Sequence, residues 1–598
     1  MLALAGDKRG LGIVRLPLRQ YSTMLSTYLR PHGHKVALLG GLLAANIALQ
    51  LVNPQILRYF LDTATSHQAA RDLLSAAALF CVIALVQQVV SVLVTYVGED
   101  VGWRATNHLR LDLARHCLRQ DLGFHNKRTP GEMIERIDGD ITNLANFLSH
   151  FVVQVLGNAL LMVGVLLLLF RVDWHVGATL GVFVVVAAVL LNRMRGLAVP
   201  YWTAARQASA DLMGFLEERI AGTQDIRSSG AQAYMMRRFY ELVRVAWRTT
   251  LKAGLLASAM VNTSWVLFAV GSALAFIVGA FLFQRGAITI GTAYLIFAYT
   301  ALLTAPLERI MQQAEDLQRA GAAIVRVGEL TQLRSAIQDG PGLTLPAGAL
   351  AVRCAGVSFA YDGADTVLHD LSFTLLPGQV LGLLGRTGSG KTTLSRLLLR
   401  LYDPTRGAVL LGAPDALQDL RCARAGDLAG RVGMVTQTVQ LFNATVRDNL
   451  TLFDRTIPDA RILEVVADVG LGPWYRALAA GLDTVLASGG GGLSAGEAQL
   501  LACTRIFLGD PGLVILDEAA SRLDPATEAL IERAVDRLLR GRTGIIIAHR
   551  LATVQRADTI MILDDGRIRE YGPRAELAAD PASQFAHLLH VGMDEVLA

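Results

Sequence analysis

The chain has 598 residues, of which 53% are hydrophobic and 18% are charged. Soluble domains average about 25% charged residues, so this composition argues against a disordered chain, a coiled coil and an all-soluble enzyme. Residues 1–346 carry 31 Lys and Arg against 22 Asp and Glu, whereas residues 347–598 carry 24 against 29. The sequence therefore divides into a basic, apolar half and an acidic half, and its basic excess does not indicate nucleic-acid binding.

Six stretches without Asp, Glu, Lys or Arg are long enough to cross a hydrocarbon core of about 30 Å. They are Val36–Leu57, Leu73–Val97, Leu148–Phe170, Val176–Asn192, Ala253–Gln284 and Gly286–Leu307. The segments before the first, third and fifth stretches contain six, seven and ten Lys or Arg, against at most two in each of the others. By the positive-inside rule, this alternation predicts six membrane spans with both termini in the cytoplasm.

The two long connections on the predicted cytoplasmic side, residues 98–147 and 193–252, contain few helix breakers and many helix formers. This pattern predicts that the membrane helices continue well beyond the bilayer. A short transverse segment is expected to bridge each pair of extensions, near Phe124–Glu132 and near Gly222–Gly230. Such extensions can transmit a movement from a soluble domain into the membrane.

Polar side chains within the six stretches are amides and hydroxyls, and most are expected to form hydrogen bonds between helices. The stretches contain no carboxylate, which argues against an ion-coupled carrier. The five cysteines are far apart and lack the spacing of metal ligands, so they are expected to be reduced packing residues. The energy for any transport must therefore come from the second half of the chain.

A phosphate-binding loop begins at Gly385. Val380–Leu384 is typical of a buried strand, and Thr393–Leu401 has the apolar spacing of a helix. Between them, Gly385–Thr392 has the P-loop pattern, in which backbone N–H groups surround phosphates at a helix N-terminus. Lys391 is expected to reach the terminal phosphates and Thr392 to bind Mg²⁺.

A second apolar run ends in two adjacent carboxylates, Asp517 and Glu518. The carboxyl end of a parallel strand is where such a sheet meets its ligand. We expect Asp517 to hold Mg²⁺ and Glu518 to orient or deprotonate the attacking water. Together with the P-loop, this pair predicts hydrolysis of a nucleoside triphosphate.

The chain resembles ABC transporters of the exporter type. Seven elements in one order resemble their ATP-binding cassette: Tyr361, the P-loop, Gln437, Leu493–Glu497, Asp517-Glu518, Ser521–Asp524 and His549. The six apolar stretches, with Gly131-Glu132 and Glu217…Gly222 in the long connections, resemble the exporter transmembrane domain. The resemblance covers roughly Lys35 to Leu589.

This resemblance implies a role for each residue of the motifs. Tyr361 would stack on adenine. The phosphates of ATP would bind to Gly385, Arg386, Thr387, Gly388, Ser389, Gly390, Lys391, Thr392 and Thr393. Thr392, Gln437 and Asp517 would hold Mg²⁺, and Glu518, His549 and Gln437 would act in catalysis. Ser494 and Gly496 would close over the γ-phosphate of a partner cassette, and Asp524 would cross that interface.

The signature motif departs from the usual Leu-Ser-Gly-Gly-Gln, because Ala495 and Glu497 replace its first Gly and its Gln. Glu497 places an anion near a polyphosphate, which is unfavourable unless the side chain points away. Upstream, the glycine run Ser488–Gly492 stands where exporters commonly have a Glu-Arg pair. Exporters with one altered signature are often heterodimers, so we expect a heterodimer with a second half-transporter subunit, with a homodimer as the alternative.

We therefore expect a multidomain protein. Its parts are a cytoplasmic N-terminal segment (1–34), an all-α six-helix transmembrane domain with long cytoplasmic helical extensions (35–320), a linker (321–346) and an α/β P-loop ATP-binding cassette (347–598). The expected activity is export across the cell membrane, driven by hydrolysis of MgATP and by alternating access after two cassettes dimerise. The expected cargo is amphipathic or hydrophobic: a small molecule, a lipid or a peptide-like product.

Two alternative functions fit the same motifs less well. Some proteins with this exporter-type architecture are importers, and the sequence does not exclude import. An ATP-gated channel or regulatory membrane subunit is disfavoured by the intact Glu518 and His549, because gating by ATP binding alone does not need them.

Overall fold

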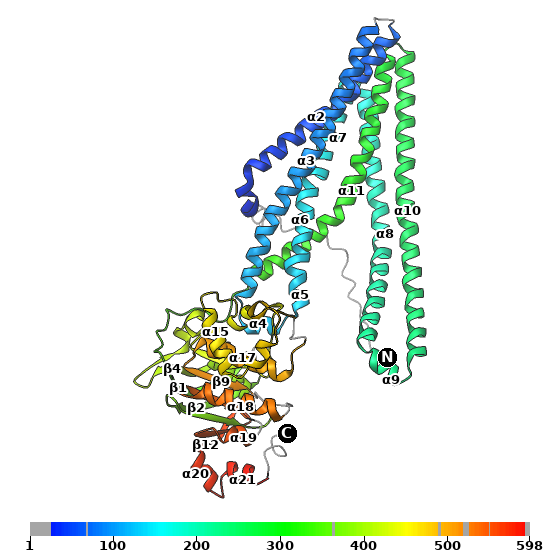
Figure 1. The fold of residues 1–598 in the computed structure, drawn as a ribbon. Coiled ribbons are helices and arrows are strands. Elements are labelled where there is room, and N and C mark those ends of the chain that lie inside the picture. The colour runs from blue at the N-terminus through cyan, green and yellow to red at the C-terminus, as the bar shows by residue number, and fades with distance from the viewer. Residues whose placement is uncertain are drawn as a thin grey trace. The chain divides into compact units, whose positions relative to one another are not determined.

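The computed structural model describes residues 26–66, 70–361, 365–487, 492–517, 525–548 and 551–591. The chain folds as two compact units (Figure 1). The first contains the residues up to Leu118 and Pro130–Leu333, and its described part is helical. The second contains Arg119–Thr129 and the residues from Arg334 onward, including every described strand.

Long helices dominate the first unit. Its elements are η1 (Arg30–His32), α2 (Gly33–Thr65), α3 (Ala70–Leu118), α5 (Pro130–Ile134), η2 (Glu135–Gly139), α6 (Asp140–His150), η3 (Phe151–Leu156), α7 (Gly157–Val172), α8 (Trp174–Ala221), α9 (Thr223–Ser228), α10 (Gln232–Gln284) and α11 (Ile290–Gln332). Asp173 alone separates α7 from α8, and its carboxylate caps α8 by accepting a hydrogen bond from the His175 N–H (2.7 Å).

Five of the described helices are long and apolar enough to cross a membrane: Ser26–Thr65, Ala70–Leu118, Gln154–Val172, Trp174–Ala221 and Gln232–Gln284. The start of α11, Ile290–Thr304, is a shorter apolar stretch. These helices contain most of each of the six apolar stretches of the sequence, so the predicted multi-pass helical domain is confirmed. The number of six spans stays a prediction, because the apolar part of α11 is short.

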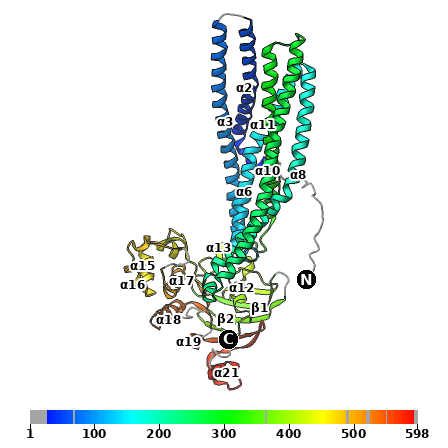
Figure 2. The same cartoon turned by 90° about the vertical axis from the view of Figure 1, so that its right-hand side faces the viewer.

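Three helices extend far beyond their apolar segments, as the sequence predicted. Helices α3, α8 and α10 have 49, 48 and 53 residues, or about 70–80 Å at 1.5 Å per residue. Figures 1 and 2 show α8 and α10 side by side along most of their length. The predicted transverse segments contain short helices, α4 (Leu122–Asn126) in the second unit and α9 (Thr223–Ser228) in the first.

Helix α11 continues to Gln332, so residues 321–332 of the expected linker are helical. The physical reason is an apolar face of small and branched side chains: Ala323, Ile324 and Val327 are buried. Their three- and four-residue spacing is that of a helix packed on one face.

An ion pair joins α6 to α11 within the first unit. The Asp140 side chain is 1% exposed and accepts hydrogen bonds from Nε (2.9 Å) and Nη2 of Arg326. The hydrogen bonds with Asp140 raise the pKa of the Arg326 guanidinium. Because a buried carboxylate needs its partner, the pair fixes α6 against α11.

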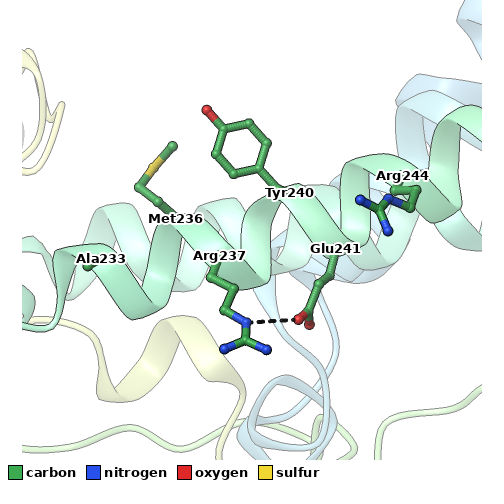
Figure 3. A pocket seen from close by; sticks show the side chains of 6 residues that line it. All are labelled: Ala233, Met236, Arg237, Tyr240, Glu241 and Arg244. Carbon is green, nitrogen blue, oxygen red and sulfur yellow. Dashed lines mark ion pairs between the residues drawn. The ribbon is translucent and has the colours of Figure 1, made fainter.

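Arg326→Ala is expected to destabilise the first unit by up to roughly 3–5 kcal/mol, since it leaves the Asp140 carboxylate buried without its partner. Thermal unfolding of the purified protein, followed by tryptophan fluorescence, measures the loss. The control is Arg237→Ala, because Arg237 is 81% exposed and pairs with Glu241 at 3.5 Å on an open face of α10 (Figure 3). The control should cost less than about 1 kcal/mol. Equal shifts in the two variants would contradict the structural role of the Asp140 pair.

The second unit is built on three sheets. A six-stranded sheet has the order β12-β11-β3-β10-β9-β6, in which only β12 is antiparallel to its neighbour. Its strands are β3 (Val380–Leu384), β6 (Val432–Val435), β9 (Leu513–Asp517), β10 (Thr543–Ile547), β11 (Thr559–Asp564) and β12 (Arg567–Pro573). An antiparallel sheet, β2-β1-β4-β5, contains β1 (Ala351–Ala360), β2 (Thr366–Leu375), β4 (Arg406–Ala413) and β5 (Ala416–Asp419), and β7 (Ala444–Thr445) pairs with β8 (Val485–Leu486).

Short helices surround these sheets. They are α4, α12 (Lys391–Leu398), η4 (Leu420–Cys422), α13 (Ala425–Leu428), α14 (Val446–Thr451), α15 (Asp459–Asp468), α16 (Gly472–Arg476), η5 (Gly481–Asp483), α17 (Ala495–Gly509), α18 (Pro525–Leu539), α19 (Leu551–Val554), α20 (Arg574–Ala579) and α21 (Gln584–Val591). Strands β3 and β10 are buried along their whole length, as continuous apolar runs in a parallel sheet should be. The predicted α/β cassette is thereby confirmed.

The helix after the P-loop differs from its predicted bounds. It begins at Lys391 rather than Thr393 and ends at Leu398 rather than Leu401. Arg400 leaves the helical conformation (φ +51°), and its buried guanidinium donates to the carbonyls of Gln338 (2.7 Å) and Arg421 (3.0 Å). Tertiary hydrogen bonds therefore end the helix before its apolar pattern does.

Candidate functional site

The P-loop, Asp517 and Gln437 lie at the carboxyl edge of the six-stranded sheet. Ile547, the last residue of β10, pairs with Leu383 of β3 on one side and Asp517 of β9 on the other. Strand β6 lies beside β9, with Val435 next to Leu516. The chain leaves these strands through the P-loop after β3, Asp517 at the end of β9 and Gln437 after β6. This edge is where parallel α/β sheets bind their ligands.

The P-loop glycines adopt conformations that other residues avoid. Gly385, Gly388 and Gly390 have φ values of +148°, +88° and +104°. A Cβ atom on Gly385 would clash with the carbonyl oxygen of Leu563, and one on Gly390 would lie 2.5 Å from Leu368 Cδ2. These positions therefore require glycine, and they lead the backbone directly into the N-terminus of α12.

Lys391 lies folded inside this loop. The residue is 6% exposed, and its Nζ donates hydrogen bonds to the carbonyl oxygens of Gly385 (2.6 Å) and Arg386 (3.0 Å). The buried Ser389 hydroxyl has no hydrogen-bond partner among the described residues. A cationic ammonium, an unsatisfied hydroxyl and a helix N-terminus facing one loop fit a polyphosphate.

The expected Mg²⁺ ligands suit a hard cation. Thr392 is an exposed residue in the first turn of α12, Asp517 ends β9, and the exposed Gln437 follows β6. The described residues contain no cluster of three or more His, Cys, Asp or Glu that could hold a metal. Mg²⁺ typically binds one or two protein groups together with substrate phosphates and water, and this donor set fits that pattern.

Tyr361 lies beside the P-loop helix. Its hydroxyl is 3.0 Å from Thr393 Oγ1 and accepts a hydrogen bond from Arg396 Nη1 (3.3 Å). The ring packs edge-on against Phe359 and Tyr402, with centroid separations of 4.7 and 5.1 Å. The residue expected to stack on adenine is thus held next to the residues expected to bind phosphates.

The signature residues open α17. Ser494 Oγ accepts from the Glu497 N–H (3.2 Å), while Glu497 Oε2 accepts from the Ser494 N–H (2.8 Å) and hydroxyl (3.0 Å). This reciprocal pair is a capping box, which stabilises a helix start. Glu497 therefore does not point away from the signature serine: its carboxylate occupies the N-terminus of α17, where the positive end of the helix dipole lies.

Glu497→Gln is expected to lower the MgATP concentration that half-saturates ATPase activity by roughly twofold to tenfold, because it removes a negative charge near the expected γ-phosphate. Glutamine keeps the capping box, so the fold is preserved. The control is Asp448→Asn, since Asp448 forms the same kind of cap with Thr445 at the start of α14. Steady-state phosphate release measures both variants. An unchanged or higher half-saturating concentration in Glu497→Gln would contradict the prediction.

Several predicted residues lie outside the described ranges. They are Glu518, Asp524 and His549, together with residues 488–491 of the glycine run. Their roles stay predictions from the sequence. Asp517, which directly precedes Glu518, and Ile547, which lies two residues before His549, pair with each other at this edge of the sheet.

The anchoring of α4 was missed from the sequence. Asp121 caps α4 by accepting from the Phe124 N–H (2.9 Å), and it also accepts from the Ala336 N–H (2.6 Å) and the Ser335 hydroxyl (3.2 Å). Burial opposes ionisation of Asp121, but these hydrogen bonds outweigh it and lower its pKa. An Asp directly before a helical segment is a typical cap, which could have revealed half of this arrangement.

Comparisons with known proteins agree with this architecture. A family model described as "ABC transporter transmembrane region" matches residues 36–307, and one described as "ABC transporter" matches residues 368–521. An ATP-dependent lipid A-core flippase of Pseudomonas putida is 32% identical, covering 90% of each chain. A fatty acid ABC transporter ATP-binding/permease protein of Mycobacterium bovis is 31% identical, covering 79% of this chain and 74% of the relative.

The fold also matches a solved structure. A bacterial Atm1-family ABC exporter with ATP bound has a TM-score of 0.77 and 24% identity, covering 94% of this chain and 98% of that one. The order of domains, the P-loop edge and the two family matches converge on one assignment. The chain belongs to the ABC transporter family as an exporter-type half-transporter, whose cassette couples ATP hydrolysis to transport.

Proposed function

We propose that this protein exports a hydrophobic or amphipathic molecule, such as a lipid or a lipid-like product, as one subunit of a dimeric pump. The observation that carries the proposal is a P-loop with a buried lysine on the same chain as long apolar helices. The named relatives act on lipid A-core and fatty acids, which supports a cargo of this class. The apolar stretches contain amides and hydroxyls but no carboxylate, which suits an amphipathic cargo.

The residues of one chain would bind the nucleotide as follows. Lys391 and the backbone amides of Gly385–Thr392 hold the phosphates, while Tyr361 stacks on the adenine ring. Thr392, Gln437 and Asp517 hold Mg²⁺, which neutralises charge on the phosphates. The buried loop fixes these groups before the nucleotide arrives, so little reorganisation is needed at the reaction step.

The chemical step would need two further groups and a second cassette. Glu518 accepts a proton from the attacking water, and His549 donates a hydrogen bond to the γ-phosphate. Ser494 and Gly496 bind the γ-phosphate held by the partner cassette, and Asp524 crosses the interface between cassettes. Closure excludes water and draws the helical extensions together, and hydrolysis releases them.

The partner is a second half-transporter subunit. The comparisons do not support the preference for a heterodimer that the altered signature suggested, so this choice rests on experiment. Substrate-stimulated ATPase activity of this chain purified alone would show that a homodimer suffices. The alternation of basic segments supports a cell-membrane location with both termini and the cassette in the cytoplasm.

Inverted membrane vesicles test the function. With this chain present, MgATP is expected to drive a fluorescent fatty acid or phospholipid probe into the vesicle lumen, and Lys391→Ala is expected to abolish that uptake. ATP-dependent loss of preloaded probe would instead indicate import. Movement of the probe on ATP binding alone, without hydrolysis, would indicate a gated channel and contradict the proposal.

A further inference from the structure

Tyr402 lies between the expected adenine residue and the bridging helix α4. On one side, its ring packs edge-on against Tyr361, with centroids 5.1 Å apart and an interplanar angle of 90°, and against Phe359 at 5.5 Å. On the other side, its hydroxyl accepts a hydrogen bond from Asn126 Nδ2 (3.0 Å). A single side chain therefore touches both Tyr361, the expected adenine residue, and α4.

The contact with α4 is close. A Cβ atom on Gly123 would be in van der Waals contact with Tyr402 Cε1, at 3.6 Å, so the ring lies beside Gly123 of α4. Residues Arg119–Thr129 belong to the same compact unit as the cassette, although they come more than 200 residues earlier in the chain. Helix α4 thus follows the cassette surface on which Tyr402 lies.

Hydrogen bonds hold the N-terminus of α4, and short segments connect α4 to the helices before and after it in the chain. Asp121 holds its N-terminus to Ser335 and Ala336. Helix α3 ends at Leu118, three residues before Asp121, and α5 begins at Pro130, four residues after Asn126. Only short connections therefore join α4 to these two helices.

Aromatic packing of this kind transmits displacement, because protein interiors are densely packed and barely compressible. Tyr361 is itself held by Thr393 and Arg396 on α12, directly after the P-loop. A purine ring stacked on Tyr361 would fix the position of that ring, and the edge-on contact would then fix Tyr402. The hydroxyl of Tyr402 would hold Asn126 in turn.

We propose that Tyr402 is a positioning residue that reports occupancy of the base site to α4, through Tyr361 on one side and Asn126 on the other. The inference rests on the proposed stacking of adenine on Tyr361. It goes beyond that proposal because the response of α4 depends on the base as well as on the phosphates. Phosphates alone, bound to the P-loop, leave the Tyr361 ring uncontacted and α4 unchanged.

Hydrogen exchange on the purified full chain tests this. The probes are the Mg²⁺ complexes of a non-hydrolysable ATP analogue and of inorganic tripolyphosphate, which has no base. Both are expected to slow exchange in residues 385–393, but only the nucleotide analogue is expected to slow exchange in residues 119–129, by about threefold or more. Tyr402→Phe and Asn126→Ala should each abolish the effect on 119–129 and keep the effect on 385–393.

A matched control removes a tyrosine hydroxyl elsewhere in the cassette. Tyr571 donates a hydrogen bond to the Thr374 carbonyl (2.6 Å), so Tyr571→Phe should behave as the unmodified chain. The double variant Tyr402→Phe with Asn126→Ala should match either single variant. Slowed exchange in 119–129 that survives Tyr402→Phe, or that tripolyphosphate produces equally well, would overturn the inference. No slowing in 385–393 with either probe would instead contradict the proposed nucleotide site itself.

Discussion

Replacing Lys391 by alanine is expected to weaken MgATP binding at least about 100-fold and to abolish ATP hydrolysis. The Lys391 ammonium is buried inside the P-loop, where the phosphates are expected to bind. Hydrogen bonds to charged groups contribute about 1.5–3 kcal/mol each, so losing the two or more that Lys391 makes to phosphate gives this magnitude. Titration with a fluorescent ATP analogue measures the affinity, and phosphate release measures turnover.

Two further variants make the Lys391 experiment specific. Lys391→Arg keeps the positive charge, but its planar guanidinium cannot take the place of the compact ammonium beside the Gly385 and Arg386 carbonyls. This variant should therefore also lose MgATP binding and ATP hydrolysis. Lys252→Ala removes an exposed lysine from α10 and should leave nucleotide binding unchanged. Near-normal affinity in Lys391→Ala would mean that the loop is not the phosphate site.

The central elements of the cassette could be predicted because their signals are local. The predicted strand Val380–Leu384 has the bounds of β3, since a short apolar run before a glycine-rich loop allows few other structures. The run that ends at Asp517 is β9 for the same reason. The membrane helices were equally accessible, because charge-free stretches of this length are rare outside membranes.

Contacts between distant residues could not be predicted in the same way. Asn126 and Tyr402 are separated by 276 positions, and Asp121 and Ala336 by 215. No local pattern encodes such pairs, because they depend on how the strands and helices pack. The early end of α12 has the same origin: the carbonyls that bind Arg400 come from residues far from it in sequence.

The altered signature motif shows that the sequence predicts the charge at residue 497 but not the position of its side chain. The sequence showed that Glu497 adds a negative charge beside Ser494, but it left open where the carboxylate points. The spacing Ser-x-x-Glu before an apolar helix is itself a capping-box pattern, and the structure forms that box. The side chain thus has a structural role in α17, and its electrostatic effect on the expected γ-phosphate stays a prediction.

Glu518→Gln is expected to lower ATP hydrolysis by roughly 10²- to 10⁴-fold while leaving MgATP affinity nearly unchanged. Asp517 ends β9 at the carboxyl edge of the sheet, beside Ile547 of β10. We expect the two carboxylates to do different work: Asp517 would hold the metal, and Glu518 would act on the attacking water. Glutamine keeps the size of glutamate but cannot accept the proton.

Comparing the two carboxylates separates binding from chemistry. Asp517→Asn should raise the Mg²⁺ concentration needed for nucleotide binding. Glu518→Gln should leave that concentration unchanged, and the Glu518→Gln protein should accumulate as ATP-bound dimers that release phosphate very slowly. Glu464→Gln, on the exposed surface of α15, is the matched control because it makes the same chemical change beside Arg461. If Glu518→Gln hydrolyses ATP at the normal rate, the base lies elsewhere. If both site variants lose only Mg²⁺ affinity, both carboxylates are metal ligands.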